Sequence, residues 1–230
     1  MKKYKHVFFD FDNTLWDFAQ NSKESLHQIY TKYELEKYFE NFEQFYQEYE
    51  ATNIKLWNDY RNGNISKETL SVRRFYFVSE LIGIHNNSPE AINREYLALT
   101  TQKTKTIDYA REILQYLKTK YKIHIITDGF FEVQIVKLQT AKLNPMIEQV
   151  ITAEEIGVLK PDIRLFEYAL EKTKATKEES IMIGDNYEND ILGAMNAGID
   201  QIFFNSENLK DLPQKPTYEV KKLQEIKNIL

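Results

Sequence analysis

The sequence has no cysteine among its 230 residues. Disulfide bonds, thiolate nucleophiles and cysteine-bound zinc are therefore excluded. The chain also lacks any apolar run that approaches the ~20 residues of a membrane span. The opening Met1-Lys2-Lys3 precedes an expected strand and not the apolar core of a signal peptide. We therefore expect a cytoplasmic protein with no membrane partner.

An excess of positive charge is missing as well. The chain has 30 Lys and Arg residues against 35 Asp and Glu residues, for a formal net charge of -5. This balance argues against a nucleic-acid backbone as the partner. The hydrophobic share of 42% is ordinary for a soluble globular protein, and the length suits one large domain or a core domain with an insert. We expect a monomer or a small homo-oligomer.

Helix and strand patterns alternate from about residue 105 to the end of the chain. This alternation predicts a Rossmann-like, doubly wound parallel sheet, an α/β core with helices on both faces. A first strand near the amino terminus belongs to the same sheet. The expected strands are 6–11, 122–127, 149–152, 181–184 and 201–204, and the expected helices are 110–120, 131–143, 161–172 and 189–197.

Residues 17–104 have a different pattern, with apolar and aromatic residues at helical spacing and no convincing strand. Ser66 is the expected N-cap of a helix that runs to Gly83, and Ser88 caps another. We therefore predict a core domain of residues 1–16 and 105–230 and an inserted all-helical cap domain of residues 17–104. The many Tyr and Phe residues of the insert are interpreted as its core and not as a surface for stacking bases.

Two carboxylates stand at the end of the first strand, where residues 7–14 read VFFDFDNT. Because strand side chains alternate, Asp10 and Asp12 are expected on the same face. Like charges repel, and an unpaired buried charge costs several kcal/mol. A hard divalent cation with oxygen ligands would neutralise the pair. The alternative is a strand that ends in two solvated aspartates before a turn.

Further signals stand after later strands, at the sheet edge where open α/β folds place their sites. Thr127, Asp128 and Gly129 offer a hydroxyl and exposed backbone N–H groups, which suit phosphate oxygens. The alternative is an ordinary turn. Lys160 would supply positive charge beside carboxylates and a phosphate, although most lysines lie on the surface.

Asp185 repeats the pattern of Asp10, since it directly follows an apolar strand that ends at Gly184. Two such strand tips side by side would form an oxygen-rich Mg²⁺ site, which typically uses one or two carboxylates plus phosphate and water. Asp190 follows five residues later, where it alternatively acts only as an acid at a helix start.

Taken together, these motifs resemble those of the haloacid-dehalogenase superfamily of phosphotransferases over essentially the whole chain. Residues 10–14 look like its first motif, Thr127 like the second and Lys160 like the third. Gly184-Asp185 with Asp190 looks like the fourth. The helical insert is similar to a type-1 cap.

The resemblance implies a role for each of these residues. Asp10 would be the nucleophile that forms an aspartyl-phosphate, and Asp12 would be the general acid and base. Mg²⁺ would be held by the Asp10 carboxylate, the Asp12 backbone carbonyl and the Asp185 carboxylate. Lys160 would balance charge, and Asp190 would orient Lys160 or metal-bound water. Phosphate oxygens would be held by Thr127 and by the backbone amides of Asp128 and Gly129.

An acid two residues after the nucleophile also separates the branches of the superfamily. Its dehalogenases lack that acid, so Asp12 indicates phosphomonoester hydrolysis or phosphomutase chemistry. Asp128 departs from the Asn that close relatives often carry. Because another negative charge facing the phosphate would weaken binding, we expect the Asp128 side chain to point away or to accept from backbone amides.

A narrower resemblance lies in the insert, where residues 56–63 and 73–75 look like those of bacterial pyrimidine 5′-nucleotidases. It implies hydrolysis of a small phosphorylated metabolite, a deoxyuridine or thymidine monophosphate. Trp57 or Trp16 would stack on the pyrimidine and Arg74 would hydrogen-bond a base or sugar oxygen, although Trp57 is alternatively a packing residue of the insert. The rival functions are a phosphoglycolate or sugar-phosphate phosphatase, a phosphomutase, and a non-catalytic module that binds phosphate or a partner.

Overall fold

The computed structural model describes residues 4–83 and 87–230, so the charged Met1-Lys2-Lys3 start lies outside the described residues. The chain divides into two compact units. Met1–Phe18 and Thr104–Leu230 form one, which we call the sheet unit, and Ala19–Lys103 form the other, which we call the helical unit. Within the described ranges, none of the helices combines the length and apolar character that crossing a membrane requires.

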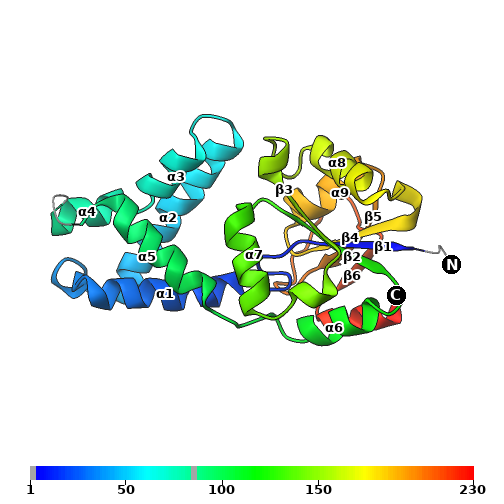
Figure 1. Ribbon diagram of the computed structural model, residues 1–230, viewed down its shortest axis with the longest axis horizontal. Coiled ribbons are helices and arrows are strands. Elements are labelled where there is room, and N and C mark those ends of the chain that lie inside the picture. The colour runs from blue at the N-terminus through cyan, green and yellow to red at the C-terminus, as the bar shows by residue number, and fades with distance from the viewer. Residues whose placement is uncertain (1–3, 84–86) are drawn as a thin grey trace. The chain divides into compact units, whose positions relative to one another are not determined.

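The sheet unit is built on six parallel strands in the order β3-β2-β1-β4-β5-β6 (Figure 1). Strand β1 is central, and its Phe9 lies in register between Ile125 of β2 and Ile183 of β4. The predicted α/β fold with a parallel sheet is confirmed. The strands are β1 (His6–Phe9), β2 (Lys122–Thr127), β3 (Gln149–Thr152), β4 (Ser180–Gly184), β5 (Asp200–Phe204) and β6 (Tyr218–Val220). Strand β6 was not predicted, because it has only three residues and buries only Val220.

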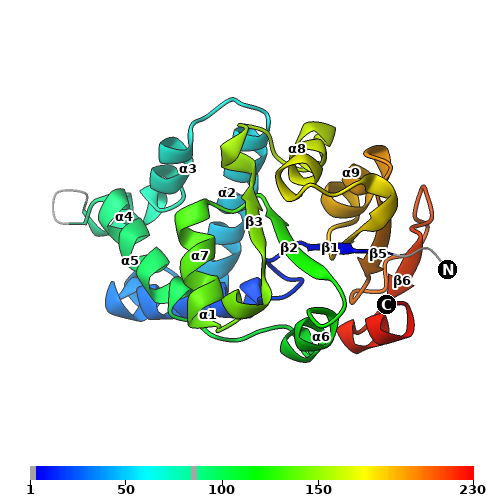
Figure 2. The same cartoon turned by 45° about the vertical axis from the view of Figure 1, so that its right-hand side comes forward.

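Helices cover both faces of this sheet (Figure 2). On one face, Val7 and Phe9 of β1 pack in a shared core with residues of α6 (Ala110–Leu117), α7 (Phe131–Thr140) and η6 (Leu223–Asn228). Helices α8 (Ile163–Thr173) and α9 (Gly193–Asn196) lie on the other side in both views. Short turns of helix complete the unit: η2 (Asn144–Met146), η3 (Ala153–Glu155), η4 (Lys177–Glu179) and η5 (Tyr187–Leu192).

The helical unit packs around an aromatic core. The rings of Tyr49, Phe75 and Tyr96 lie with their centroids 5.3 to 5.8 Å apart. All three side chains are buried, as expected for core residues. Its elements are α1 (Phe18–Lys32), η1 (Leu35–Lys37), α2 (Phe42–Arg61), α3 (Lys67–Arg73), α4 (Tyr76–Ile82) and α5 (Pro89–Thr101). The first residue of α1, Phe18, is the last residue of the first segment of the sheet unit.

Two of the predicted N-caps are confirmed. The hydroxyl of Ser66 accepts the backbone N–H of Thr69 at 3.2 Å, and the hydroxyl of Ser88 accepts that of Ala91 at the same distance. The helix predicted from Ser66 to Gly83 is wrong as one element. It breaks between α3 and α4, where the chain turns to bury the Phe75 ring completely.

Several predicted boundaries are also corrected. The helix expected from Pro161 begins at Ile163, because the carboxylate of Asp162 accepts the N–H of Arg164 as its cap. The helix expected over 189–197 is a π-helix, η5, followed by the short α9, and its N-cap is Asn186. The helices expected over 110–120 and 131–143 end earlier, at Leu117 and Thr140.

Strand β1 ends at Phe9 and not at Phe11, which matters for the two aspartates. The backbone carbonyl of Phe11 accepts the N–H groups of Leu15 and Trp16, and Asn13 has a φ of 65°. Asn tolerates this left-handed conformation better than most residues. The chain therefore leaves the strand in a tight loop, and strand alternation does not determine where the Asp12 side chain points.

Candidate active site

The carboxyl ends of β1, β2 and β4 bring four of the predicted residues together. Asp10 directly follows β1, Thr127 ends β2, and Asp185 directly follows β4. Lys160 reaches the same place from the loop before α8. Because β1 lies between β2 and β4, Asp10 at the end of β1 has the tips of the other two strands on either side.

Lys160 is the centre of this cluster and is 3% exposed. Its Nζ donates to Asp10 Oδ1 at 2.5 Å, to Asp190 Oδ1 at 2.7 Å and to the backbone carbonyl of Ile126 at 3.2 Å. An ammonium group has three N–H donors, so all of them are used. The surface alternative for Lys160 is therefore wrong, and its charge is committed to the two carboxylates.

Asp185 is held by Thr14, a residue to which the sequence analysis gave no role. The Thr14 hydroxyl donates to Asp185 Oδ1 at 2.6 Å and accepts the backbone N–H of Asp185 at 3.0 Å. This reciprocal pair ties the loop after β1 to the tip of β4. The sequence shows a hydroxyl four residues after Asp10, but it does not show that Thr14 is fully buried against Asp185.

Three carboxylates form the acidic group of the site. Oxygens of Asp10, Asp185 and Asp190 all lie within 4.8 Å of one another. Gly184 leaves the space for this approach, since a Cβ there would stand 2.3 Å from Asp190 Oδ2. Three buried or half-buried carboxylates face the single ammonium of Lys160, which leaves negative charge for a cation to neutralise.

Burial is the largest influence on the pKa values of these groups, and their charged neighbours add to it or oppose it. Burial raises the pKa of Asp10 well above its usual range, Lys160 opposes the rise, and Asp190 and Asp185 add to it. Burial, together with Asp190, raises the pKa of Asp185 to about 7 against the hydrogen bond from Thr14. Burial by itself lowers the pKa of Lys160, but Asp10, Asp190 and Asp128 outweigh burial and raise it.

The Asp12 side chain is not one of these three carboxylates and is paired with a different lysine. Its Oδ1 and Oδ2 lie 2.8 and 3.1 Å from Lys137 Nζ, and Oδ2 also accepts from Gln134 Nε2 at 2.8 Å. Both partners come from α7 and were missed by the sequence analysis. The only available signal was their spacing of three residues, which places them on one helix face.

The candidate phosphate-binding residues lie at the tip of β2. Thr127 Oγ1 accepts the backbone N–H of Gly129 at 3.1 Å and Gln134 Nε2 at 2.9 Å, so the hydroxyl proton is left to donate to a ligand. Asp128 Oδ1 accepts the backbone N–H of Lys160 at 2.9 Å. This contact agrees with the expectation that the Asp128 carboxylate binds a backbone amide.

The two predicted substrate contacts of the insert, Trp57 and Arg74, lie within the helical unit. Trp57 is half-buried on α2, and its ring meets that of Tyr60 edge-on at 5.9 Å. Arg74 follows α3 and is 6% exposed. It lies close enough to Tyr49 for its charge to oppose the rise that burial causes in the pKa of that phenol. Their contact with a substrate stays a prediction.

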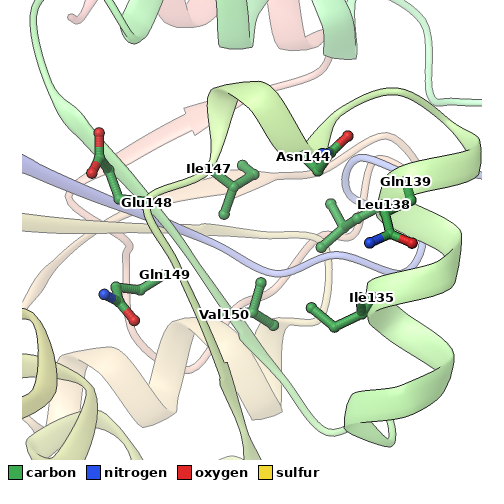
Figure 3. Close-up of a pocket in the computed structure, with 8 residues that line it drawn as sticks. All are labelled: Ile135, Leu138, Gln139, Asn144, Ile147, Glu148, Gln149 and Val150. Carbon is green, nitrogen blue, oxygen red and sulfur yellow. The ribbon is translucent and has the colours of Figure 1, made fainter.

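A separate hollow of about 160 Å³ lies between α7 and β3 (Figure 3). Ile135 and Leu138 of α7 and Val150 of β3 contribute to its lining. None of the predicted site residues lines it. The hollow is therefore separate from the candidate active site, which α7 contacts through Gln134 and Lys137.

The chain matches the family described as haloacid dehalogenase-like hydrolase over residues 7–204. It is 32% identical to the pyrimidine 5′-nucleotidase YjjG of Escherichia coli, over 99% of this chain and 98% of that protein. It is 31% identical to the pyrimidine 5′-nucleotidase PynA of Streptococcus pneumoniae, over 99% and 97%. Its fold is similar to the crystal structure of the HAD-hydrolase YfnB from Bacillus subtilis bound to magnesium, with a TM-score of 0.85, 25% identity and 99% of each chain covered.

Proposed function

The chain belongs to the haloacid dehalogenase-like hydrolase family, and from that premise we propose that it is a phosphomonoester hydrolase of pyrimidine nucleoside monophosphates. The observation that carries the proposal is that the carboxylates of Asp10 and Asp12, with one residue between them, have different partners and different exposure. The Asp10 side chain is 11% exposed and paired with Lys160, whereas the Asp12 side chain is 26% exposed. The first setting suits a fixed nucleophile, and the second suits a group that exchanges a proton with ligand and water.

Hydrolysis would proceed in two displacements at phosphorus. Asp10 Oδ1 is held by Lys160, so Oδ2 attacks the phosphorus and forms the aspartyl-phosphate bond. The ester P–O bond breaks, and Asp12 gives its proton to the leaving oxygen. The Asp12 carboxylate then takes a proton from the water that attacks phosphorus, the bond to Asp10 breaks, and inorganic phosphate leaves.

The phosphate would be held by a hydroxyl and by backbone N–H groups at the tip of β2. Thr127 Oγ1 accepts hydrogen bonds from Gly129 and Gln134, so its own proton can be donated to a phosphate oxygen. The backbone N–H of Asp128 is the further donor that we assign to the phosphate. The Asp128 carboxylate accepts the N–H of Lys160, so one of its oxygens is directed to a backbone amide and not to the phosphate.

Mg²⁺ fits the donor set at the strand tips. The oxygens of Asp10, Asp185 and Asp190 converge within 4.8 Å, and hard oxygen donors are those that Mg²⁺ prefers. Burial, with Asp190, raises the pKa of Asp185 to about 7, so a bound cation would favour its charged form. We assign the Asp10 and Asp185 carboxylates and the Asp12 carbonyl as ligands, with Asp190 orienting Lys160. When bound, the ion supplies positive charge that offsets both the nucleophile and the phosphate.

The choice of pyrimidine nucleotides is supported by the two relatives of that name, which match almost the whole chain. We propose that the helical unit is the cap and supplies the contacts to the nucleoside. Trp57, which is half-buried, is the proposed stacking residue. Arg74 can reach a base or sugar oxygen only if its burial beside Tyr49 is relieved, so it is the weaker assignment.

The deciding experiment is phosphate release from a panel of esters in the presence of Mg²⁺. The panel contains deoxyuridine, thymidine and purine monophosphates, phosphoglycolate and sugar phosphates. We expect the pyrimidine nucleotides to have the highest kcat/KM. A sugar phosphate that turns over much faster than every pyrimidine nucleotide would move the proposal to that substrate class. Absence of hydrolysis of every ester would favour a non-catalytic binding module.

A further inference from the structure

Helix α7 holds the Asp12 carboxylate by both of its oxygens. Lys137 Nζ lies 2.8 Å from Oδ1 and 3.1 Å from Oδ2, and Gln134 Nε2 donates to Oδ2 at 2.8 Å. Charge-assisted bonds of this kind are stronger than neutral ones and fix the plane of a carboxylate. The Asp12 carboxylate is therefore held in one orientation although it is partly exposed.

Lys137 is unusual because its side chain is 4% exposed and, among the residues that the structure describes, its ammonium group pairs with one carboxylate, that of Asp12. Its Nζ also lies 4.3 Å from the centroid of the Trp16 ring and 5.2 Å from that of Phe18. Burying an ammonium group is costly unless it is paired, and aromatic faces offset only part of that cost. The ion pair with Asp12 is thus the interaction that keeps this charge inside the fold.

Gln134 connects the same carboxylate to the phosphate-binding tip of β2. Its side chain is fully buried, and its Nε2 donates both to Asp12 and to Thr127 Oγ1. Gly129 leaves the space for this amide, since a Cβ there would stand 1.9 Å from Nε2. One amide therefore fixes the separation between the group that would move the proton and the hydroxyl that would hold the phosphate.

We propose that Lys137 and Gln134 are positioning residues that aim the Asp12 carboxylate at the oxygen of the leaving group. The inference rests on the proposed function, because it assigns the step in which Asp12 passes its proton to that oxygen as the ester P–O bond breaks. A reacting group displaced by about 1 Å can lose a factor of 10² in rate. Releasing Asp12 from α7 would therefore impair protonation of the leaving group more than attack by Asp10.

The test compares two esters that differ in their need for a proton. Nitrophenolate leaves p-nitrophenyl phosphate readily without protonation, whereas the alkoxide of a nucleotide or sugar phosphate does not. The variants are Lys137→Met, which keeps the apolar stem and removes the charge, and Lys137→Arg, which keeps the charge. The matched control is Lys172→Met, which removes a lysine of α8 that pairs with Glu155.

We expect Lys137→Met to lower kcat/KM for the fastest alkyl phosphate of the panel at least tenfold more than kcat/KM for p-nitrophenyl phosphate. The loss should appear in kcat and not in KM, and Lys137→Arg should recover most of it. Lys172→Met should leave both esters within about twofold of the wild type, as expected of a surface ion pair. An equal loss for the two esters would mean that Lys137 only stabilises the fold, and the inference would be wrong.

Gln134→Met gives a second, independent decision in case Lys137→Met does not fold. It removes the amide that bridges Asp12 and Thr127 but keeps the charge of Lys137. We expect a smaller loss with the same preference for the alkyl ester, in protein whose circular dichroism matches the wild type. An unchanged ratio of the two esters in Gln134→Met overturns the inference. If the wild type hydrolyses neither ester, the proposed function fails first, and that outcome is distinct from a wild type that is active but whose variants keep the ratio.

Discussion

Asp10 and Asp12 are separated by one residue, yet each has its own cation. Lys160 pairs with Asp10 and Lys137 pairs with Asp12. The two pairs differ in the charge around them, because Asp10 also lies beside Asp185 and Asp190. At the scale of single residues, the proposed roles of Asp10 as nucleophile and Asp12 as acid rest on these different surroundings, since the residue type is the same.

The first prediction concerns Asp10→Asn. An amide oxygen is a poor nucleophile, so the variant should lose turnover of every phosphate ester by ~10³-fold or more. The measurement is phosphate release at saturating substrate. The matched control is Asp211→Asn, an exposed loop position with a φ of 58° that Asn readily adopts. Activity that survives in Asp10→Asn would refute the covalent mechanism.

A second prediction concerns Asp128→Asn. The Asp128 carboxylate accepts the N–H of Lys160, and an Asn side-chain oxygen can accept the same bond. We therefore expect kcat/KM to change by less than tenfold, which corresponds to about 1.4 kcal/mol. An increase of tenfold or more would show that the carboxylate repels the bound phosphate, contrary to this contact.

At the scale of elements, α7 contributes more than the sequence predicts. The sequence indicates an amphipathic helix after β2, and the structure confirms a helix over Phe131–Thr140. Its apolar residues Ile135 and Leu138 line the hollow against β3 (Figure 3). Its polar residues Gln134 and Lys137 meet Asp12. One helix therefore packs beside the edge strand β3 and also holds the Asp12 carboxylate in place.

Strands β1 and β2 carry a buried histidine pair. His6 Nδ1 and His124 Nε2 lie 3.0 Å apart, and the rings stack with their centroids 5.2 Å apart. Burial, with charge from neighbouring groups, lowers the pKa of His124 to about 3, and burial also lowers the pKa of His6. The fold therefore accommodates these rings in their neutral form.

The third prediction follows from the sign of that shift. Below pH ~6.5 His124 binds a proton in the unfolded chain but stays neutral in the folded protein. As the pH falls, this difference lowers the free energy of unfolding by up to about 1.4 kcal/mol per pH unit. The fall continues down to the folded pKa of about 3. In urea unfolding between pH 8 and pH 4, the wild type should lose stability relative to His124→Gln. A difference that stays constant over this range would contradict the prediction.

At the scale of the whole molecule, the chain is organised as a sheet unit interrupted by a helical unit. The sheet unit contains every residue of the acidic group together with Thr127 and Lys160. Mg²⁺ binding is therefore expected to stabilise the sheet unit in the absence of substrate, because a ligand that binds only the folded state raises its stability.

The fourth prediction compares the wild type with Asp185→Asn. The pKa of Asp185 is raised to about 7, so its favourable contribution to folding is lost as the pH rises through 7. At pH 8 with a chelator, Asp185→Asn should therefore melt at a higher temperature than the wild type, and the gap should shrink at pH 4 to 5. Added Mg²⁺ should raise the Tm of the wild type, because a ligand at a hundredfold excess over its Kd raises the free energy of unfolding by about 2.7 kcal/mol. It should leave Asp185→Asn unchanged.

Removal of Mg²⁺ by a chelator should also abolish activity. Phosphate release by the wild type should stop when the chelator is added and return with Mg²⁺. An equal rise in Tm with Mg²⁺ in both proteins would show that Asp185 is not a ligand, even if chelation still inhibits.

The sequence by itself determined the parallel sheet and the placement of Asp10, Thr127 and Asp185. The strand and helix periods are local, and the carboxyl ends of parallel strands necessarily share one edge. The tertiary structure decided which cation neutralises each aspartate. Lys137 meets Asp12 across 125 positions of the chain, and Thr14 meets Asp185 across 171. Such partners depend on how α7 and the strand loops pack, and no local pattern encodes that packing.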